Sequence, residues 1–517
     1  MTHQFICTPT EPVVRTTAGK VRGFIVDGIR TFHGIPYAQA KRFQMPEPVT
    51  PWTGIFDAMS YGCVCPMLER ESAQGEVLVP HRYWPKDENC QSLNIWTPGL
   101  SGKPRPVIVW LHGGGFSSGS SIEQVAYDGE ALSRFGDVVV VSLNHRLNIL
   151  GYLDLSRYGG QYWNSGNVGN ADIAAALEWI RDNIEGFGGD PDNVTLMGQS
   201  GGGTKITSLM QTPAADGLFH KGIIMSGIAD LLSLPTGIDT QAIGEALLHR
   251  LGLTARQAAT LETLPYERLA EAYNEVSPAI RRAGGYVGCL PLPGSYFLGD
   301  PRDVGFTEHA KTIPCLTGSV LAEFAFGPGV TNKHDLSRAE QLELVERIMG
   351  AKTEELAALF EEAHPGRNLT DLLFLDSFTR APTSAFCEKK AAAGGAPVYS
   401  YLFTFEFPIN GGKTAWHCSD IPFAFHNTGK VPVCCVPGVT ETLEERMCSA
   451  FVRFARTGDP NTPGLPHWPA CAPGDLATMI LDTDCEVRHN FDKALYDAFL
   501  PAAPDPFVLN GEAIVLH

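Results

Sequence analysis

Residues 193–203 constrain the fold more than any other part of the chain. They read Asn-Val-Thr-Leu-Met-Gly-Gln-Ser-Gly-Gly-Gly, a short apolar run followed by glycines on both sides of one serine. Residues 204–211 then have the apolar spacing of a helix. A strand that turns directly into a helix needs small residues beside the turning residue, which is held on a strained backbone with its side chain presented to solvent. The segment therefore predicts a nucleophile elbow with Ser200 at its tip.

The same glycines suggest a phosphate-binding loop, but the register of that motif fails. A P-loop requires Gly-Lys followed by Ser or Thr. Here Gly203 is followed by Thr204 and only then by Lys205. The serine elbow is therefore the better interpretation.

Strands and helices alternate on both sides of this elbow. Residues 106–111 and 138–143 are near-continuous apolar runs, as expected of strands buried on both faces. Between them and the elbow, residues 170–187 place Ile173, Leu177, Ile180 and Ile184 on one helical face. This alternation predicts an α/β fold with a large, mainly parallel central sheet covered by helices. Further strands are expected at 93–96, 221–226, 312–317 and 398–405, and a final long helix at 440–457.

Two segments depart from the alternation and are predicted to be helical insertions. They cover about 239–274 and 337–390, and the second begins with a capping box formed by Ser337 and Glu340. No Pro/Ser/Gly linker isolates either segment. We therefore expect a single domain over residues 1–517.

The overall charge excludes some partners. Acidic residues number 57 and basic residues 39, and no Lys/Arg-rich run occurs, which argues against nucleic acid. No apolar run approaches the roughly 20 residues that span a bilayer. Residues 1–12 lack the pattern of a signal peptide, so a cytoplasmic location is expected. The 13 cysteines lack zinc-site spacing, and we predict no metal and no cofactor.

A glycine-rich segment follows the strand predicted at 106–111. His112-Gly113-Gly114-Gly115-Phe116 would let backbone N–H groups point into a cleft, as in the oxyanion holes of ester hydrolases. A plain flexible loop is the alternative. The site is favoured because the glycines lie at the end of a buried strand, where α/β folds place their ligands.

A nucleophilic serine needs a base, and the base needs an acid that orients it. In the order that α/β-hydrolases use, the chain offers Ser200, then Glu323 just past a strand, then His417. Asp420 and Asp303 are rival acids. Glu323 is preferred because it leaves a strand, and because Asp420 is too close to His417 in the chain to reach the far ring nitrogen easily.

These segments together resemble the type-B carboxylesterases, relatives of cholinesterases and bacterial p-nitrobenzyl esterases. The resemblance covers most of the chain. Besides the elbow and the glycine loop, it rests on the segments Phe-His-Gly-Ile-Pro-Tyr-Ala at 32–38, Leu-Asn-Ile-Trp-Thr-Pro at 93–98, Phe-Gly-Gly-Asp-Pro at 187–191, His417 with Asp-Ile-Pro-Phe at 420–423, and Phe-Ala-Arg-Thr-Gly-Asp-Pro-Asn at 454–461.

The resemblance implies an α/β-hydrolase fold, with helical insertions around a deep active-site gorge. It implies Ser200 as nucleophile, His417 as general base and then acid, and Glu323 as orienting acid. The expected oxyanion donors are the N–H groups of Gly114, Gly115 and Gly201. Ser226 and Gln199 would lie around the catalytic residues and would not themselves react.

Several residues depart from the family pattern. Gln199 stands in place of the usual glutamate, and without that carboxylate a choline ester is not expected as substrate. Gly201 stands in place of the usual alanine. Phe324 follows Glu323 where a glycine is usual, and His145 replaces a tyrosine. Cys65 and Cys90 match a disulfide of secreted relatives, and whether they form one is left open.

The predicted function is hydrolysis of small carboxylic esters through an acyl-enzyme. A carbamate or amide hydrolase with the same triad is an alternative, and a non-catalytic binding module is a more remote one. The natural ester and the oligomeric state are not predicted.

Overall fold

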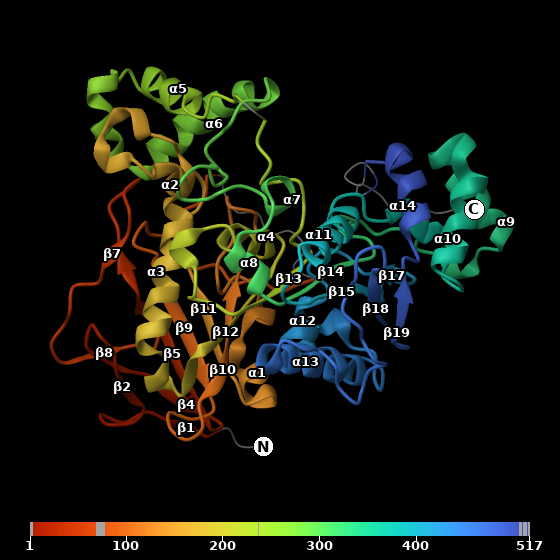
Figure 1. Ribbon diagram of the computed structural model, residues 1–517, viewed down its shortest axis with the longest axis horizontal. Helices are drawn as coiled ribbons and strands as arrows, with labels where there is room; N and C mark the ends of the chain where they lie inside the picture. The colour runs from red at the N-terminus through yellow and green to blue at the C-terminus, as the bar shows by residue number, and fades with distance from the viewer. Residues whose placement is uncertain (1–3, 69–77, 236, 506–508, 510–513, 515–517) are drawn as a thin grey trace.

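The computed structural model describes residues 4–68, 78–235, 237–505, 509 and 514. A twelve-stranded sheet runs through it in the order β1-β4-β5-β9-β11-β10-β12-β13-β14-β15-β18-β19 (Figure 1). Its strands are β1 (Phe5–Ile6), β4 (Phe24–Val26), β5 (Ile29–Pro36), β9 (Ser92–Thr97), β10 (Arg105–Leu111), β11 (Val139–Leu143), β12 (Gly189–Gln199), β13 (Lys221–Met225), β14 (Cys315–Val320), β15 (Val398–Phe403), β18 (Ala477–Leu481) and β19 (Glu486–His489).

The middle of the sheet is parallel and both of its edges are antiparallel. Every neighbouring pair from β11 to β18 is parallel. The pairs β1–β4, β4–β5, β5–β9, β9–β11 and β18–β19 are antiparallel. This confirms the predicted mainly parallel sheet, and it brings the carboxyl ends of β10, β12 and β14 to one edge. Small sheets are formed by β2 (Val13–Arg15), β3 (Lys20–Arg22) and β8 (Ile55–Asp57), by β6 (Ala38–Gln39) and β7 (Glu47–Pro48), and by β16 (Glu406–Phe407) and β17 (Lys413–Thr414).

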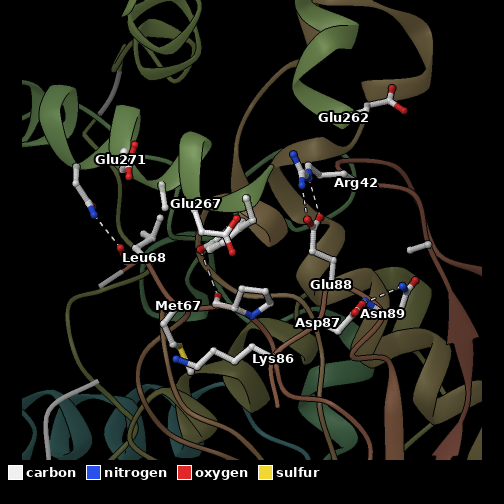
Figure 2. A pocket seen from close by; sticks show the side chains of 15 residues that line it. Arg42, Met67, Leu68, Lys86, Asp87, Glu88, Asn89, Glu262, Glu267 and Glu271 are labelled. Carbon is white, nitrogen blue, oxygen red and sulfur yellow. Dashed lines mark hydrogen bonds and ion pairs between the residues drawn. The ribbon is translucent and has the colours of Figure 1, made fainter. Parts of the chain in front are cut away.

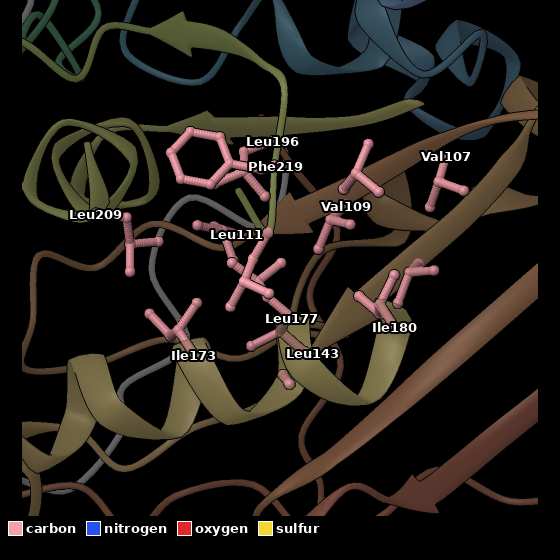
Figure 3. Packing of buried hydrophobic residues seen from close by; sticks show 14 of the residues in the cluster. Val107, Val109, Leu111, Leu143, Ile173, Leu177, Ile180, Leu196, Leu209 and Phe219 are labelled. Carbon is pink, nitrogen blue, oxygen red and sulfur yellow. The ribbon is translucent and has the colours of Figure 1, made fainter. Parts of the chain in front are cut away.

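Alternate side chains of the central strands enter two separate cores. On β10, Val107 and Val109 lie in one core, and Ile108 and Trp110 lie in the other. The first core is covered by α3 (Val168–Asn183), α4 (Gly201–Leu209) and α11 (Arg380–Ala392). The second is covered by α1 (Gly129–Gly136), α12 (Ile421–Ala424) and α13 (Thr440–Thr457). Figure 3 shows Ile173, Leu177 and Ile180 of α3 facing the side chains of β10.

The two predicted insertions are helical and stand at different ends of the molecule (Figure 1). The first contains α5 (Ala242–Arg250) and α6 (Tyr266–Arg282). The second contains α9 (Arg338–Met349), α10 (Thr353–Ala363) and α11, and Ser337 forms its capping box with Glu340. The other α-helices are α2 (Asn148–Tyr152), α7 (Pro301–Val304), α8 (Glu308–Thr312) and α14 (Lys493–Phe499).

One strand begins later than its sequence predicts. A strand was expected over residues 312–317, whereas β14 covers Cys315–Val320. The reason is that Thr312 is the last residue of α8, whose first turn is capped by Thr307 accepting a hydrogen bond from the Ala310 N–H. β14 ends three residues before Glu323. Within the part of the chain that is described, no helix has the length and apolar character to cross a membrane.

Candidate active site

Ser200 occupies a strained turn between β12 and α4. Its backbone has φ 57° and ψ −129°, a conformation that non-glycine residues rarely adopt. The Ser200 N–H donates to the Met225 carbonyl of β13 at 2.8 Å, and the Ser200 carbonyl accepts from the Thr204 N–H at 3.1 Å. Such a conformation costs about 1–3 kcal/mol and persists only where its surroundings hold it. The elbow geometry predicted from the sequence is therefore present.

The glycine loop after β10 packs directly on the elbow. Gly114 and Gly115 have φ values of 79° and 62°, which a residue with a side chain would adopt only under strain. A Cβ atom added to Gly201 would lie 2.3–2.4 Å from the O, Cα and N atoms of Gly115. The alanine that is usual at this position in the resembling family could not fit unless the loop moved. The three predicted oxyanion donors therefore belong to one close-packed piece of backbone.

His417 is joined to Glu323 through both side chain and backbone. The distance from His417 Nδ1 to Glu323 Oε2 is 2.5 Å, and the His417 N–H donates to the Glu323 carbonyl. Glu323 is 0% exposed, and its Oε1 accepts from the Val320 N–H at 3.0 Å. Because the carboxylate accepts the Nδ1 proton, the neutral imidazole keeps Nε2 free to act as a base.

Among the described hydrogen bonds, neither rival acid is joined to His417. Asp420 is buried, and its Oδ2 accepts a hydrogen bond from the Tyr401 hydroxyl at 2.8 Å. Burial raises the pKa of Asp420 to about 7. Asp303 lies in α7 and accepts from the Ser233 hydroxyl. The acid hydrogen-bonded to His417 is thus Glu323.

Gln199 lies between the elbow and the histidine. Its Nε2 is 3.3 Å from His417 Nε2 and 3.4 Å from Nδ1, and its Oε1 accepts from the Cys418 thiol at 3.2 Å. Among the described hydrogen bonds, none joins the Ser200 hydroxyl to His417. Hydrogen bonds of this kind are often long in unliganded enzymes and shorten with substrate bound.

Thr379 and Asp376 support Glu323, and sequence reasoning did not single them out. The Thr379 hydroxyl lies 2.9 Å from Glu323 Oε1 and 2.7 Å from Asp376 Oδ2. A hydroxyl has one proton, so it donates to only one of these oxygens at a time. Burial, with the nearby charge of Glu323, raises the pKa of Asp376 to about 6. Both residues fall within a predicted helical segment, where nothing in the sequence marks them.

A buried lysine lies beneath the glycine loop and was also not predicted. Lys205 of α4 is 0% exposed, and its Nζ donates to the His112 carbonyl at 2.9 Å. The imidazole rings of His112 and His145 stack nearby, 5.3 Å apart. Burial, then the charge of Lys205, holds the pKa of both histidines well below the usual range. In the sequence, Lys205 drew attention only as the lysine that is out of place for a P-loop.

The remaining predicted residues lie outside hydrogen-bonding reach of the triad. Ser226 directly follows β13, and its N–H donates to the Gly318 carbonyl of β14 at 2.7 Å. Its buried hydroxyl finds no hydrogen-bond partner among the described residues. Cys65 and Cys90 are buried free thiols in contact, and this contact together with burial raises the pKa of Cys90 well above normal.

An aromatic group adjoins His417. The Phe324 ring stacks on His417 with centroids 4.8 Å apart. Phe378 and Phe326 place their rings edge-on to Phe324, at 4.9 Å and 6.2 Å. Phe326 is 43% exposed and Phe378 is 42% exposed. The departure at Phe324 thus adds apolar surface beside the site.

A hollow of about 950 Å³ lies under α6, and none of the predicted site residues lines it (Figure 2). Five carboxylate side chains line it. Arg42 is paired with Glu88, and Asn89 donates to Asp87. The carboxylates belong to Asp87, Glu88, Glu262, Glu267 and Glu271.

A strained serine after the central parallel strand, with a glycine loop and a histidine–glutamate pair at the same sheet edge, is the architecture of the α/β-hydrolase fold. The chain belongs to the carboxylesterase family, whose model matches residues 10–499. It is therefore a carboxylic ester hydrolase.

Individual relatives agree with this assignment. The chain is 33% identical to the para-nitrobenzyl esterase of Bacillus subtilis (strain 168), over 95% of this chain and 97% of the relative. It is 32% identical to the phenmedipham hydrolase of Pseudarthrobacter oxydans, over 93% and 97%. The structure of an esterase from anaerobic Clostridium hathewayi, described as able to hydrolyse aliphatic aromatic polyesters, matches with a TM-score of 0.94 at 55% identity, covering 97% of this chain and 100% of that one.

Proposed function

We propose that Ser200, His417 and Glu323 hydrolyse carboxylic esters in two acyl-transfer steps. Ser200 attacks the ester carbonyl while His417 Nε2 takes its proton, and Glu323 stabilises the imidazolium that forms. The alcohol leaves with the proton from His417. Water then attacks the acyl-enzyme by the same route and releases the acid.

The N–H groups of Gly114, Gly115 and Gly201 stabilise the oxyanion in both steps. Donors of this type contribute about 3 kcal/mol each to the transition state. The close packing of Gly201 on Gly115 supports this assignment, because it fixes the donors before substrate arrives.

The observation that carries the proposal is the 2.5 Å contact between His417 and Glu323, which follow β15 and β14, at the same sheet edge as the strained Ser200 that follows β12. Its test is hydrolysis of p-nitrophenyl acetate, butyrate and octanoate by wild type and Ser200→Ala. Activity and fluorophosphonate labelling should both disappear in the variant. Equal hydrolysis by the two proteins would leave the chain as a binding module. Carbamate and anilide substrates, tested in parallel, would reveal the alternative hydrolase.

We further propose that the preferred esters carry an aromatic ring near the cleaved bond. The exposed rings of Phe326 and Phe378 offer apolar surface next to His417, and aromatic pairs contribute about 0.5–1.5 kcal/mol beyond burial of area. The Clostridium relative, which acts on aliphatic aromatic polyesters, supports the same class.

The double variant Phe326→Ala/Phe378→Ala tests the aromatic preference. Its kcat/KM for bis(2-hydroxyethyl) terephthalate, divided by that for diethyl adipate, should fall about tenfold. An unchanged ratio would refute the aromatic preference and leave the esterase mechanism intact.

We also propose a single domain over residues 1–517 that works in the cytoplasm on small molecules and not on nucleic acid. The net charge of −18 and the 13 free thiols support this setting. Fractionation of the native host with an antibody to the chain would test the location.

A further inference from the structure

One face of the first turns of α4 lies against the glycine loop. A Cβ added to Gly202 would lie 1.9 Å from the Leu111 carbonyl oxygen and 3.0 Å from that of His112. Gly201 makes the equivalent contact with Gly115. Lys205 lies three and four residues beyond these glycines, and so on the same helical face. The helix that begins at the nucleophile therefore supports the loop with two glycines and one lysine.

Lys205 makes this contact in a dry environment. Its Nζ donates to the His112 carbonyl at 2.9 Å and lies 5.8 Å from the centre of the Phe116 ring. The His112 carbonyl precedes Gly114 by two residues, so the ammonium is hydrogen-bonded to the loop that supplies the oxyanion donors.

The surroundings of Lys205 keep other positive charge away. His112 and His145 are neutral because burial and the lysine lower their pKa values. Burial lowers the pKa of Lys205 itself to about 7, and the charge of Glu123 opposes that shift. A charge in a site of low polarity acts much more strongly on a nearby oxyanion than a charge in water.

We propose that Lys205 is a positioning residue for the oxyanion-binding loop, and that its ammonium adds positive potential where the oxyanion forms. This inference rests on the proposed roles of Ser200 and of the loop. Lys205 holds the loop through the His112 carbonyl and does not contact substrate.

The chain contains a matched control. Lys390 of α11 is also buried, donates to the Lys311 carbonyl at 2.9 Å, and lies 5.6 Å from the ring of Phe306. It lies near Cys315, at the start of β14, whereas Glu323 follows the other end of that strand. Lys390→Met removes the same interactions at a place remote from the site.

The experiment compares Lys205→Met, Lys205→Gln and Lys390→Met on p-nitrophenyl butyrate. Loss of a direct oxyanion donor costs about 100-fold or more in kcat, so loss of a group that holds the donors should cost about tenfold in both Lys205 variants. KM should change less than twofold. Glutamine retains an N–H donor without charge and is the second variant should methionine prevent folding. Lys390→Met should keep the wild-type kcat.

A second readout separates oxyanion stabilisation from general damage. A trifluoromethyl ketone forms a hemiketal oxyanion with the serine, so its inhibition constant should rise by the factor by which kcat/KM falls. A wild-type kcat in either Lys205 variant, or unchanged inhibition by the ketone, would overturn the inference. An inactive wild-type protein would instead refute the proposed function.

Discussion

Buried carboxyl groups lie on one side of the Ser200–His417 pair, which we call the acid flank, and a buried lysine lies on the other, the cationic flank. The acid flank consists of Glu323, Asp376 and Asp420, all buried. The cationic flank consists of Lys205 beneath the glycine loop. Ester hydrolysis creates an imidazolium and an oxyanion together, and each flank opposes the charge that forms beside it.

The two flanks differ in how the pKa values of their buried groups are shifted. On the cationic flank Lys205 carries the charge at pH values below its pKa of about 7, because both neighbouring histidines are held neutral. On the acid flank, burial raises the pKa of Asp376 to about 6 and that of Asp420 to about 7. Like charges disfavour one another in a buried site. The comparison teaches that the two carboxyls near Glu323 are protonated more easily than usual, whereas Glu323 is the one hydrogen-bonded to His417.

Of the changes considered, removal of the Glu323 carboxylate should lower activity most. Glu323→Gln leaves a neutral amide beside His417 Nδ1, which favours the wrong tautomer and no longer stabilises the imidazolium. We expect kcat to fall about 10⁴-fold. Steady-state hydrolysis of p-nitrophenyl butyrate measures this, with Ser200→Ala as the inactive limit. A loss below tenfold would transfer the orienting role to another acid.

Asp420→Asn should remove a pH dependence of stability. The folded pKa of about 7 exceeds the ordinary aspartate pKa of 3.8, so between these values the unfolded state releases a proton that the folded state retains. Wild-type stability should therefore fall as pH rises through this window, whereas the variant has no such loss. Its stability advantage should grow by about 4 kcal/mol between pH 4 and pH 8.

Urea unfolding across this pH range measures the effect of Asp420→Asn. The exposed Asp484→Asn is the control and should show no such growth. A pH-independent difference between Asp420→Asn and wild type would mean that Asp420 is ionised in the folded protein.

Gly201→Ala tests how closely the cationic flank is packed. The new Cβ would overlap the Gly115 backbone, so the loop must move away from its donor geometry. We expect kcat/KM to fall about 100-fold, although the change restores the residue usual in the family. The control Gly160→Ala places a Cβ in open space. Full activity of Gly201→Ala would show that the loop adjusts freely.

Gln199→Glu has the smallest expected effect and introduces a negative charge beside the serine. The wild type should not prefer acetylcholine over its neutral isostere 3,3-dimethylbutyl acetate. The new carboxylate should raise that preference about fivefold through attraction of the cation. Gln161→Glu adds the same charge at an exposed position and should leave the ratio unchanged. Strong wild-type selectivity for acetylcholine would contradict this account.

Local patterns allowed most of the fold to be predicted. The helix expected at 440–457 is α13 with the same bounds, because its apolar residues recur at the helical period. The strand expected at 312–317 was wrong at its start, since Thr312 belongs to the short helix α8 that begins after Thr307. Apolar runs do not show where a capped turn ends.

The supporting groups of the site could not be found in this way. Lys205 lies on α4, where every residue is buried, so the helix has no polar face against which the lysine would stand out. Asp376 is part of the site only through Thr379, whose hydroxyl also contacts Glu323. The contact of Thr379 with Glu323 joins residues far apart in the chain and leaves no local pattern.

The strand order also determines when the protein becomes active during its synthesis. Ser200 and the strands around it precede residue 230, whereas His417 follows β15. Ribosomes add about 5–20 residues per second, so the histidine is incorporated roughly 10–40 s after the serine. Throughout that interval the nascent chain carries its nucleophile without a base. A nascent chain is thus expected to be inert towards esters until residue 417 has been added.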